Sequence, residues 1–384
     1  MQERDLVGQL VECIKHQSEN PPGHVHTIVH WLKQWAYQFG AEIERQKVET
    51  NKENVVITLD LGPGPSLVFN THMDVNNPSG QKWSFSPTEP KISEDRVYGL
   101  GACDAKGSLV SMMCAMEDIA FHPEGLCGKL ILTAVMGEEA GGIGSLHLVQ
   151  EGITADAAVV GEPTNGNIAV AHKGTYMKKL TFKGIPYHSG TPGKGVNAIH
   201  HAAHFIGKIE KLNERLSAMP HFALGPPSAA VTIIQGGTRQ NTIPETCEII
   251  LDRRLLPGET HEQADREVDT IIHQLKKEVK HFNVEVIETI VATVPSETDT
   301  KEKIVQKSLE AAAEIEGVEK EAIGFPAGCD MSKLVTHAKI PTVICGPGKL
   351  EQAHKPDEYV EISQLFKAKA IYASIAKKVL KSSG

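Results

Sequence analysis

The stretch that most constrains the fold is residues 129–144, with the sequence KLILTAVMGEEAGGIG. Residues 130–135 form a continuous apolar run that is bounded by Gly128 and Gly137. A short run without alternation is typical of a strand buried on both faces, as in a parallel sheet covered by helices. We therefore predict an α/β fold with this strand near its centre.

Two adjacent carboxylates, Glu138 and Glu139, follow this strand directly. Neighbouring side chains on extended backbone point in opposite directions. One carboxylate can therefore hold a metal ion while the other faces a water molecule or a substrate. The alternative is a solvated pair of glutamates that begins a helix, since acidic residues are favoured at helix N-termini.

Other residues that can bind a metal also follow predicted strands. His72 and Asp74 follow residues 66–70, and Glu162 follows residues 157–160. Ligands of open α/β sheets collect at the carboxyl ends of strands, so solvated loops explain such a set poorly. A His-x-Asp pattern at a strand end also suits a metal-bound imidazole whose second nitrogen donates to a carboxylate.

Two more candidates complete the set, Asp104 and His354. Gly99-Leu100-Gly101 begins like a dinucleotide-binding fingerprint, but Asp104 occupies the place of the third glycine, which excludes that motif. Asp104 instead precedes a helix predicted to run to about residue 121, where it is either an N-cap or a metal ligand. His354 lies beyond a strand predicted at residues 340–345.

These candidates offer imidazole and carboxylate groups and no thiolate, which suits zinc, cobalt or manganese. They can serve two metal ions about 3.5–4 Å apart if one carboxylate bridges the ions. Glu138 is adjacent to a ligand without being needed as one, so it can take the proton of a water held there. The predicted metal ligands are His72, Asp104, Glu139, Glu162 and His354.

The pattern of the chain changes from about residue 175. Strands and helices are then predicted in the order β-α-β-β-α-β up to residue 292, which matches a ferredoxin-like unit with a one-sided antiparallel sheet. We predict a catalytic domain made of residues 1–174 and 293–384, with residues 175–292 inserted as a second domain. The catalytic domain is predicted to hold a mixed, mostly parallel sheet with helices on both faces.

Composition excludes several classes of protein. The net charge of −9 disfavours nucleic-acid binding. No apolar run approaches membrane-spanning length, and the first ten residues, MQERDLVGQL, are charged where a secretory signal is apolar. The seven cysteines form no CxxC pair, which favours reduced thiols. We therefore expect a cytoplasmic protein that binds neither nucleic acid nor membranes.

The ordered ligand set resembles that of the co-catalytic zinc amidohydrolases, the family of acetylornithine deacetylase, succinyl-diaminopimelate desuccinylase, aminoacylase and carboxypeptidase G. The match covers nearly the whole chain and implies a zinc-exopeptidase-like catalytic domain. It further implies that His72, Asp104 and Glu162 hold one ion, and that Asp104, Glu139 and His354 hold the other.

The resemblance also assigns roles to neighbouring residues. Asp74 is expected to orient His72, Glu138 is expected to be the general base, and the peptide bond after Asp104 is expected to be cis. Cys103 and Cys329 depart from the family pattern. These two differences affect the expected lining of the pocket and leave the expected ligand set unchanged.

The inserted domain is similar to the family's lid, which makes a homodimer. His188 in Tyr187-His188-Ser189-Gly190 matches a lid histidine that reaches the partner's active site, and Asn241 and Arg254 match residues that hold the substrate carboxylate. Each of these residues also has a simpler interpretation. His188 can be a surface-loop histidine, Asn241 a turn residue and Arg254 one partner of a salt bridge.

The sequence thus predicts a homodimeric di-metal hydrolase that removes the acyl group from an N-acyl amino acid. The expected cofactors are two divalent ions, zinc first and cobalt or manganese as alternatives. The nearest rival is an exopeptidase acting on dipeptides or C-terminal residues at the same site. A non-catalytic binding protein is a more remote rival, because such a protein has no use for a free base beside the metals. The sequence specifies neither the acyl group nor the amino acid.

Overall fold

The computed structural model describes residues 6–381 and divides into two compact units. The second unit comprises residues 172–296 and 326–328, and the first comprises the described residues on either side. The predicted insertion, residues 175–292, lies wholly within the second unit. Residues 1–5 of the charged N-terminal stretch lie outside the described residues.

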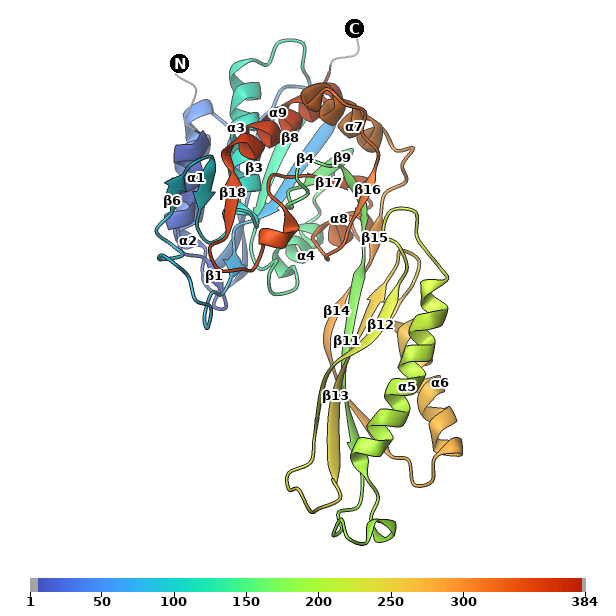
Figure 1. Ribbon diagram of the computed structural model, residues 1–384. Helices are drawn as coiled ribbons and strands as arrows, with labels where there is room; N and C mark the ends of the chain where they lie inside the picture. Colours follow the sequence, from blue (N-terminus) through green and yellow to red (C-terminus); the bar gives the residue numbers. More distant parts are fainter. Residues whose placement is uncertain (1–5, 382–384) are drawn as a thin grey trace. The chain divides into compact units, whose positions relative to one another are not determined.

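The first unit is built on a mixed sheet whose central strands run parallel (Figure 1). Burial of β8 on both faces from Leu130 onward agrees with the sequence pattern and confirms the α/β class. In sheet order the parallel strands are β17 (Thr342–Ile344), β9 (Ala157–Val160), β4 (Ser66–His72) and β8 (Lys129–Val135).

Further strands flank this parallel centre, and β10, β3 and β2 pair antiparallel with their neighbours. The sequence pattern does not reveal β2, because EIERQKVE is charged along its length and lies at an exposed sheet edge. Charged edge strands are a common protection against edge-to-edge aggregation. The flanking strands are β3 (Lys52–Asp60) and β2 (Glu42–Glu49) on one side, and β10 (Ala169–His172), β15 (Ser296–Glu297) and β16 (Ile323–Phe325) on the other.

Helices cover both faces of this sheet. Phe69 and Asn70 are neighbours on β4 and therefore point to opposite faces. The Phe69 ring lies 5.5 Å from that of Tyr372 on α9, whereas Asn70 donates to Ser145 on α4. The helix α9 (Ile362–Val379) packs against α1 (Leu6–Lys15), α3 (Lys106–Phe121) and α7 (Lys303–Glu316). The helix α4 (Ile143–Gln150) packs against α8 (Met331–Thr336), and α2 (His26–Ala36) packs against β3.

Short strands lie beside this sheet. One pair joins β1 (Glu19–Asn20) to β5 (Val75–Asn76), and a small sheet joins β6 (Lys91–Ser93), β7 (Arg96–Tyr98) and β18 (Tyr359–Glu361).

The second unit has the predicted ferredoxin-like order of elements. Its antiparallel sheet runs β12-β13-β11-β14, and the side chains of α5 and α6 pack on one face of it. The side chains of Ile233 and Ile234 on β12 are each 50% exposed. The elements are β11 (Gly174–Lys183), α5 (Ala198–Ser217), β12 (Ser228–Gly236), β13 (Thr246–Leu255), α6 (His261–Glu278) and β14 (Val284–Thr293).

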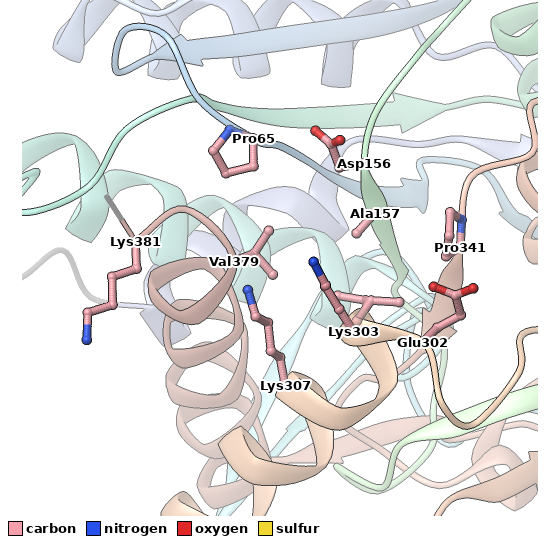
Figure 2. Close-up of a pocket in the computed structure, with 10 residues that line it drawn as sticks. Pro65, Asp156, Ala157, Glu302, Lys303, Lys307, Pro341, Val379 and Lys381 are labelled. Carbon is pink, nitrogen blue, oxygen red and sulfur yellow. The ribbon is translucent and has the colours of Figure 1, made fainter. Parts of the chain in front are cut away.

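A cavity of about 470 Å³ lies at the N-terminal ends of the parallel strands in the first unit (Figure 2). Pro65, Ala157 and Pro341 line it where β4, β9 and β17 begin, and Lys303 and Lys307 of α7 complete one wall. The predicted metal ligands belong to the opposite, carboxyl ends of these strands, so this cavity is separate from them.

No disulfide joins any of the seven cysteines, all of which lie in the described part of the chain. None of the helices formed by residues 6–381 has the length and apolarity needed to cross a membrane.

Candidate metal centre

The five predicted ligands converge at the carboxyl ends of the parallel strands. They form two overlapping groups that share Asp104, and the potential ligand atoms within each group all lie within 4.8 Å of one another. His72 ends β4, Glu162 and Glu139 follow β9 and β8, Asp104 precedes α3, and His354 precedes β18. The first group is His72, Asp104 and Glu162, and the second is Asp104, Glu139 and His354.

Asp104 lies between the two imidazoles. Its Oδ1 is 3.1 Å from Nε2 of His72, and its Oδ2 is 3.3 Å from Nε2 of His354. A Glu162 oxygen is 3.9 Å from Nε2 of His72, and the Glu139 oxygens are 3.0 and 3.1 Å from Nε2 of His354. Each Asp104 oxygen therefore faces a different imidazole, so this carboxylate offers one oxygen to the His72 side of the cluster and one to the His354 side.

The charges of the cluster fit divalent cations. Burial raises the pKa of Glu139 and raises that of Glu162 well above its usual range. Burial acts in the same direction on Asp104, but hydrogen bonds from His354 and His72 hold its pKa below the usual value. The hydrogen bonds that His354 donates to Asp104 and Glu139 raise the pKa of His354 to about 11. Three carboxylates thus crowd two imidazoles, and ionised carboxylates with neutral imidazoles are the forms that bind metal.

Glu138 lies beside this cluster and belongs to neither ligand group. Burial raises the pKa of its carboxyl group to about 8. The charge of His72 lowers this pKa, and the charges of Asp330 and Glu139 raise it. A carboxylate whose pKa lies near neutral pH can both accept and return a proton. Asp330 itself is buried, accepts a hydrogen bond from Ser145, and lies 3.3 Å from Lys333.

The backbone at Glu138 and Glu139 differs from the prediction. We expected extended backbone to separate the two side chains, but β8 ends at Val135 and both glutamates lie in a turn. The Gly141 N–H donates to the Glu138 carbonyl at 2.9 Å. Gly137 adopts a φ of 76°, which favours glycine, so the strand ends before the carboxylates.

Asp74 also acts differently from the expectation that its carboxylate orients His72. The Nδ1 atom of His72 lies 2.8 Å from the main-chain carbonyl of Asp74 and 3.8 Å from its carboxylate. The carboxylate instead accepts hydrogen bonds from Asn20 at 2.8 Å and from the main-chain N–H groups of Glu138 and Glu139 at 3.2 and 3.3 Å. Asp74 therefore orients His72 through its carbonyl and fixes the Glu138–Glu139 turn through its carboxylate.

Sequence reasoning missed one further residue, Glu358. Its buried carboxylate accepts hydrogen bonds from the main-chain N–H groups of Gly101, Cys103 and Asp104 at 2.8–3.0 Å. Burial raises its pKa to about 8, while those donors lower it. Glu358 lies four residues after His354, but nothing in the sequence indicates that it contacts the Asp104 segment.

The thiols near the cluster do not resemble nucleophiles. Cys103 and Cys329 are buried, and burial raises the pKa of both thiols well above the usual value. The Asp104–Ala105 peptide bond is cis, as the family resemblance implies.

His188 and Asn241 lie close together in loops at one end of the second unit's sheet. The Ser189 N–H donates to the Asn241 carbonyl at 2.9 Å, and both side chains belong to exposed residues. The Gly190 N–H donates to Nδ1 of His188 at 3.0 Å. A neutral His188 ring therefore carries its proton on Nε2, which leaves an outward-facing donor.

Arg254 lies inside β13, one residue before the strand ends. Its guanidinium pairs with Asp252 at 3.0 Å and donates to Thr175 at 2.8 Å. Asn241 precedes the opposite end of β13, and eight residues of strand span about 26 Å. One chain therefore does not bring Asn241 and Arg254 together on a single small carboxylate.

Known proteins were compared with this chain in sequence and in structure. The sequence matches Peptidase family M20/M25/M40 over residues 68–378. Acetylornithine deacetylase from Proteus mirabilis is 30% identical over 348 residues, which cover 88% of this chain and 85% of that protein.

Two solved structures show the same fold. Aminopeptidase PepT from Bacillus cereus has a TM-score of 0.81 and 23% identity, with 99% of both chains covered. The YXEP protein of Bacillus subtilis, described as a dinuclear metal binding peptidase from the M20 family, has a TM-score of 0.73 and 18% identity over 98% of this chain and 97% of that one. The family match spans most of the chain, including all five predicted metal ligands. The chain therefore belongs to Peptidase family M20/M25/M40 and is a hydrolase of that family.

Proposed function

We propose that this hydrolase removes the acyl group from an N-acyl amino acid. The observation that carries the proposal is the pair of ligand groups that share Asp104, together with the carboxylate of Glu138, which lies beside both groups and belongs to neither. The similarity to an acetylornithine deacetylase over 88% of the chain supports the substrate class.

The proposed cofactors are two divalent ions, zinc first and cobalt or manganese as alternatives. Such ions supply Lewis-acid activation of an amide carbonyl and of a water molecule. His72 and Glu162 would hold one ion, Glu139 and His354 the other, and Asp104 both.

Glu138 is the proposed general base and acid. Its carboxylate oxygen takes a proton from the attacking water and returns it to the leaving amine nitrogen. Asp74 holds the main chain of Glu138, so the base is fixed relative to the ligands. His188 is proposed to donate its Nε2 proton to the developing oxyanion of the substrate.

Cleavage of a peptide bond by the same residues is the second candidate function. The similarity to aminopeptidase PepT and to the YXEP peptidase favours it, and both reactions break an amide C–N bond. Turnover of N-acetyl, N-succinyl and N-formyl amino acids, compared with that of dipeptides and tripeptides under added zinc, cobalt or manganese, tests the proposal. Higher kcat/KM on any acyl amino acid than on every peptide supports it, and the reverse order assigns the enzyme to the peptidases.

We propose that Arg254 selects substrates with a free carboxylate. A guanidinium pairs with a carboxylate through two parallel N–H donors. Replacing the acid by its carboxamide should lower kcat/KM roughly 30- to 5,000-fold, the equivalent of about 2–5 kcal/mol for a lost charge partner. Arg254→Ala should remove most of this discrimination. Arg254→Lys should keep part of the hydrolysis rate, because a lysine ammonium carries the charge but cannot form the two parallel hydrogen bonds of a guanidinium.

Arg45 offers a matched control for Arg254. It also pairs with a carboxylate, that of Glu53, but lies on the edge strand β2. Arg45→Ala should keep the full preference for the acid. Equal hydrolysis of acid and carboxamide by the unaltered enzyme would remove Arg254 from the binding of the carboxylate.

We further propose a homodimer formed through the second unit, with His188 and Asn241 serving the partner's metal centre. The edge strand β12, with half-exposed Ile233 and Ile234, offers unpaired main-chain groups and apolar surface for such a contact. The partners of the enzyme are then a small substrate and a second copy of itself. We place the enzyme in the cytoplasm, where thiols that form no disulfide remain reduced.

Mixing two inactive variants tests this arrangement. If His188 acts on the partner, His188→Ala and Glu138→Gln chains should together regain about a quarter of the wild-type activity, because half of the dimers are mixed and each has one intact site. Activity is measured after subunit exchange has been verified with differently tagged chains. A mixture of Glu138→Gln and Glu139→Gln, both altered beside the metals, should regain none. If the first mixture stays inactive as well, His188 does not act across the dimer.

A further inference from the structure

We propose that Glu358 is a positioning residue of the metal centre, whose carboxylate fixes the main chain that carries the shared ligand Asp104. The inference rests on the proposed metal-dependent function and adds to it a residue that is not a ligand.

The Glu358 carboxylate accepts hydrogen bonds from the segment leading into α3. The residue is 2% exposed. Its Oε2 accepts from the Gly101 N–H at 3.0 Å, and its Oε1 accepts from the N–H groups of Cys103 and Asp104 at 2.8 and 3.0 Å. A carboxylate is an acceptor-only group that can serve several donors at once, and buried main-chain donors need such acceptors.

These bonds tie together two of the three segments that carry the second group, those of Asp104 and His354. The Gly99 N–H donates to the Glu358 carbonyl at 2.9 Å, so the contact is made by both the side chain and the main chain. His354 lies four residues before Glu358, and its Nε2 is 3.3 Å from Oδ2 of Asp104. A shift of the Asp104 main chain would therefore displace a ligand of both groups at once.

Glu358 is not itself placed as a ligand. Both of its oxygens accept from main-chain donors, and it belongs to neither of the ligand groups found among residues 6–381. It resembles the outer partners of metal ligands, whose replacement typically lowers metal affinity roughly 10- to 100-fold.

Glu358→Gln keeps the size of the side chain but turns one acceptor into a donor. At least one main-chain N–H then faces an amide N–H and loses its bond. We expect the zinc dissociation constant, measured on metal-free protein by competition with a chromophoric chelator, to rise roughly 10- to 100-fold. At saturating zinc, kcat should return to within a few-fold of wild type with an unchanged substrate KM, since the defect lies in holding the metal.

A merely structural role would give a different result. It would lower the melting temperature but leave the zinc dissociation constant of the folded protein, measured well below that temperature, at the wild-type value. Glu117 is the matched control, because it is also buried on this unit and accepts a hydrogen bond from Trp35 at 3.1 Å. Glu117→Gln should lower the melting temperature and leave the zinc dissociation constant unchanged.

A measurement on the unaltered chain covers the case in which Glu358→Gln does not fold. Hydrogen–deuterium exchange at Gly101, Cys103 and Asp104 should already be slow in metal-free protein, because the Glu358 carboxylate accepts from those N–H groups before metal arrives. Fast exchange there, or wild-type zinc affinity in folded Glu358→Gln, overturns the proposal while leaving the metal-dependent function standing. Failure of wild-type protein to bind zinc, cobalt or manganese would instead overturn the proposed function.

Discussion

Removal of divalent metal will abolish hydrolysis, and added zinc, cobalt or manganese will restore it. Two carboxylates and two imidazoles surround the carboxylate of the shared Asp104, and the proposed activating charge comes from the cations that these groups would hold. Dialysis against a chelator followed by activity assays measures the loss, and native mass spectrometry should count up to two ions per chain. Metal loss should also lower the melting temperature, since a ligand at about 100 times its Kd stabilises the folded state by about 2.7 kcal/mol.

Ligand variants make this prediction specific. Asp104→Asn alters both groups and should prevent binding of both ions, whereas Glu139→Gln alters only the second group and should spare the first ion. A metal-free preparation with full activity would contradict the whole mechanism.

Glu138→Gln will lower kcat by roughly 10²- to 10⁴-fold, the usual contribution of general acid–base catalysis, and will leave both ions bound. The amide cannot accept the proton of the attacking water, and the same group is proposed to serve the leaving amine. Because the Glu138 main chain is held by Asp74, the isosteric amide should leave the turn intact. Steady-state kinetics and metal content, measured on the same preparation, check the two halves of the prediction.

Glu139→Gln is the matched neighbour for this experiment, since it carries the same chemical change one residue away. It should lower metal content and activity together, and excess metal should recover part of its activity. If Glu138→Gln hydrolyses substrate at the wild-type rate, another group moves the proton.

The first unit is largely predictable from the sequence because most of its candidate metal ligands directly follow short apolar runs. The uniform apolar run that ends at Val135 has one favoured environment, a strand buried on both faces, and it becomes β8. Parallel strands bring their carboxyl ends to one edge, so His72 and Glu162, distant in sequence, are expected to meet. The order β-α-β-β-α-β likewise predicts the sheet of the second unit.

Contacts set by tertiary structure could not be predicted in this way. Whether Asp74 meets His72 through its carboxylate or its carbonyl depends on where the Glu138–Glu139 turn presents its N–H groups. Glu358 acquires its contacts only when β18 pairs with β7 and brings it beside residues 99–104. The pairing of Arg254 with Asp252 likewise depends on the backbone, because two residues that are two apart on β13 lie on the same face of the sheet.

The chain leaves and re-enters the sheet of the first unit at adjacent places. β10 ends at His172 and β15 begins at Ser296, these strands are neighbours, and the Thr298 N–H donates to the Val170 carbonyl at 2.9 Å. Neighbouring strands lie about 4.8 Å apart, a gap that a few linking residues close. Exchange or deletion of the intervening segment should therefore preserve the strand order of the first unit and every residue of the two ligand groups. Exchange of this segment between related proteins would therefore replace His188, Asn241 and Arg254 together, at one junction, and leave the five residues of the ligand groups in place.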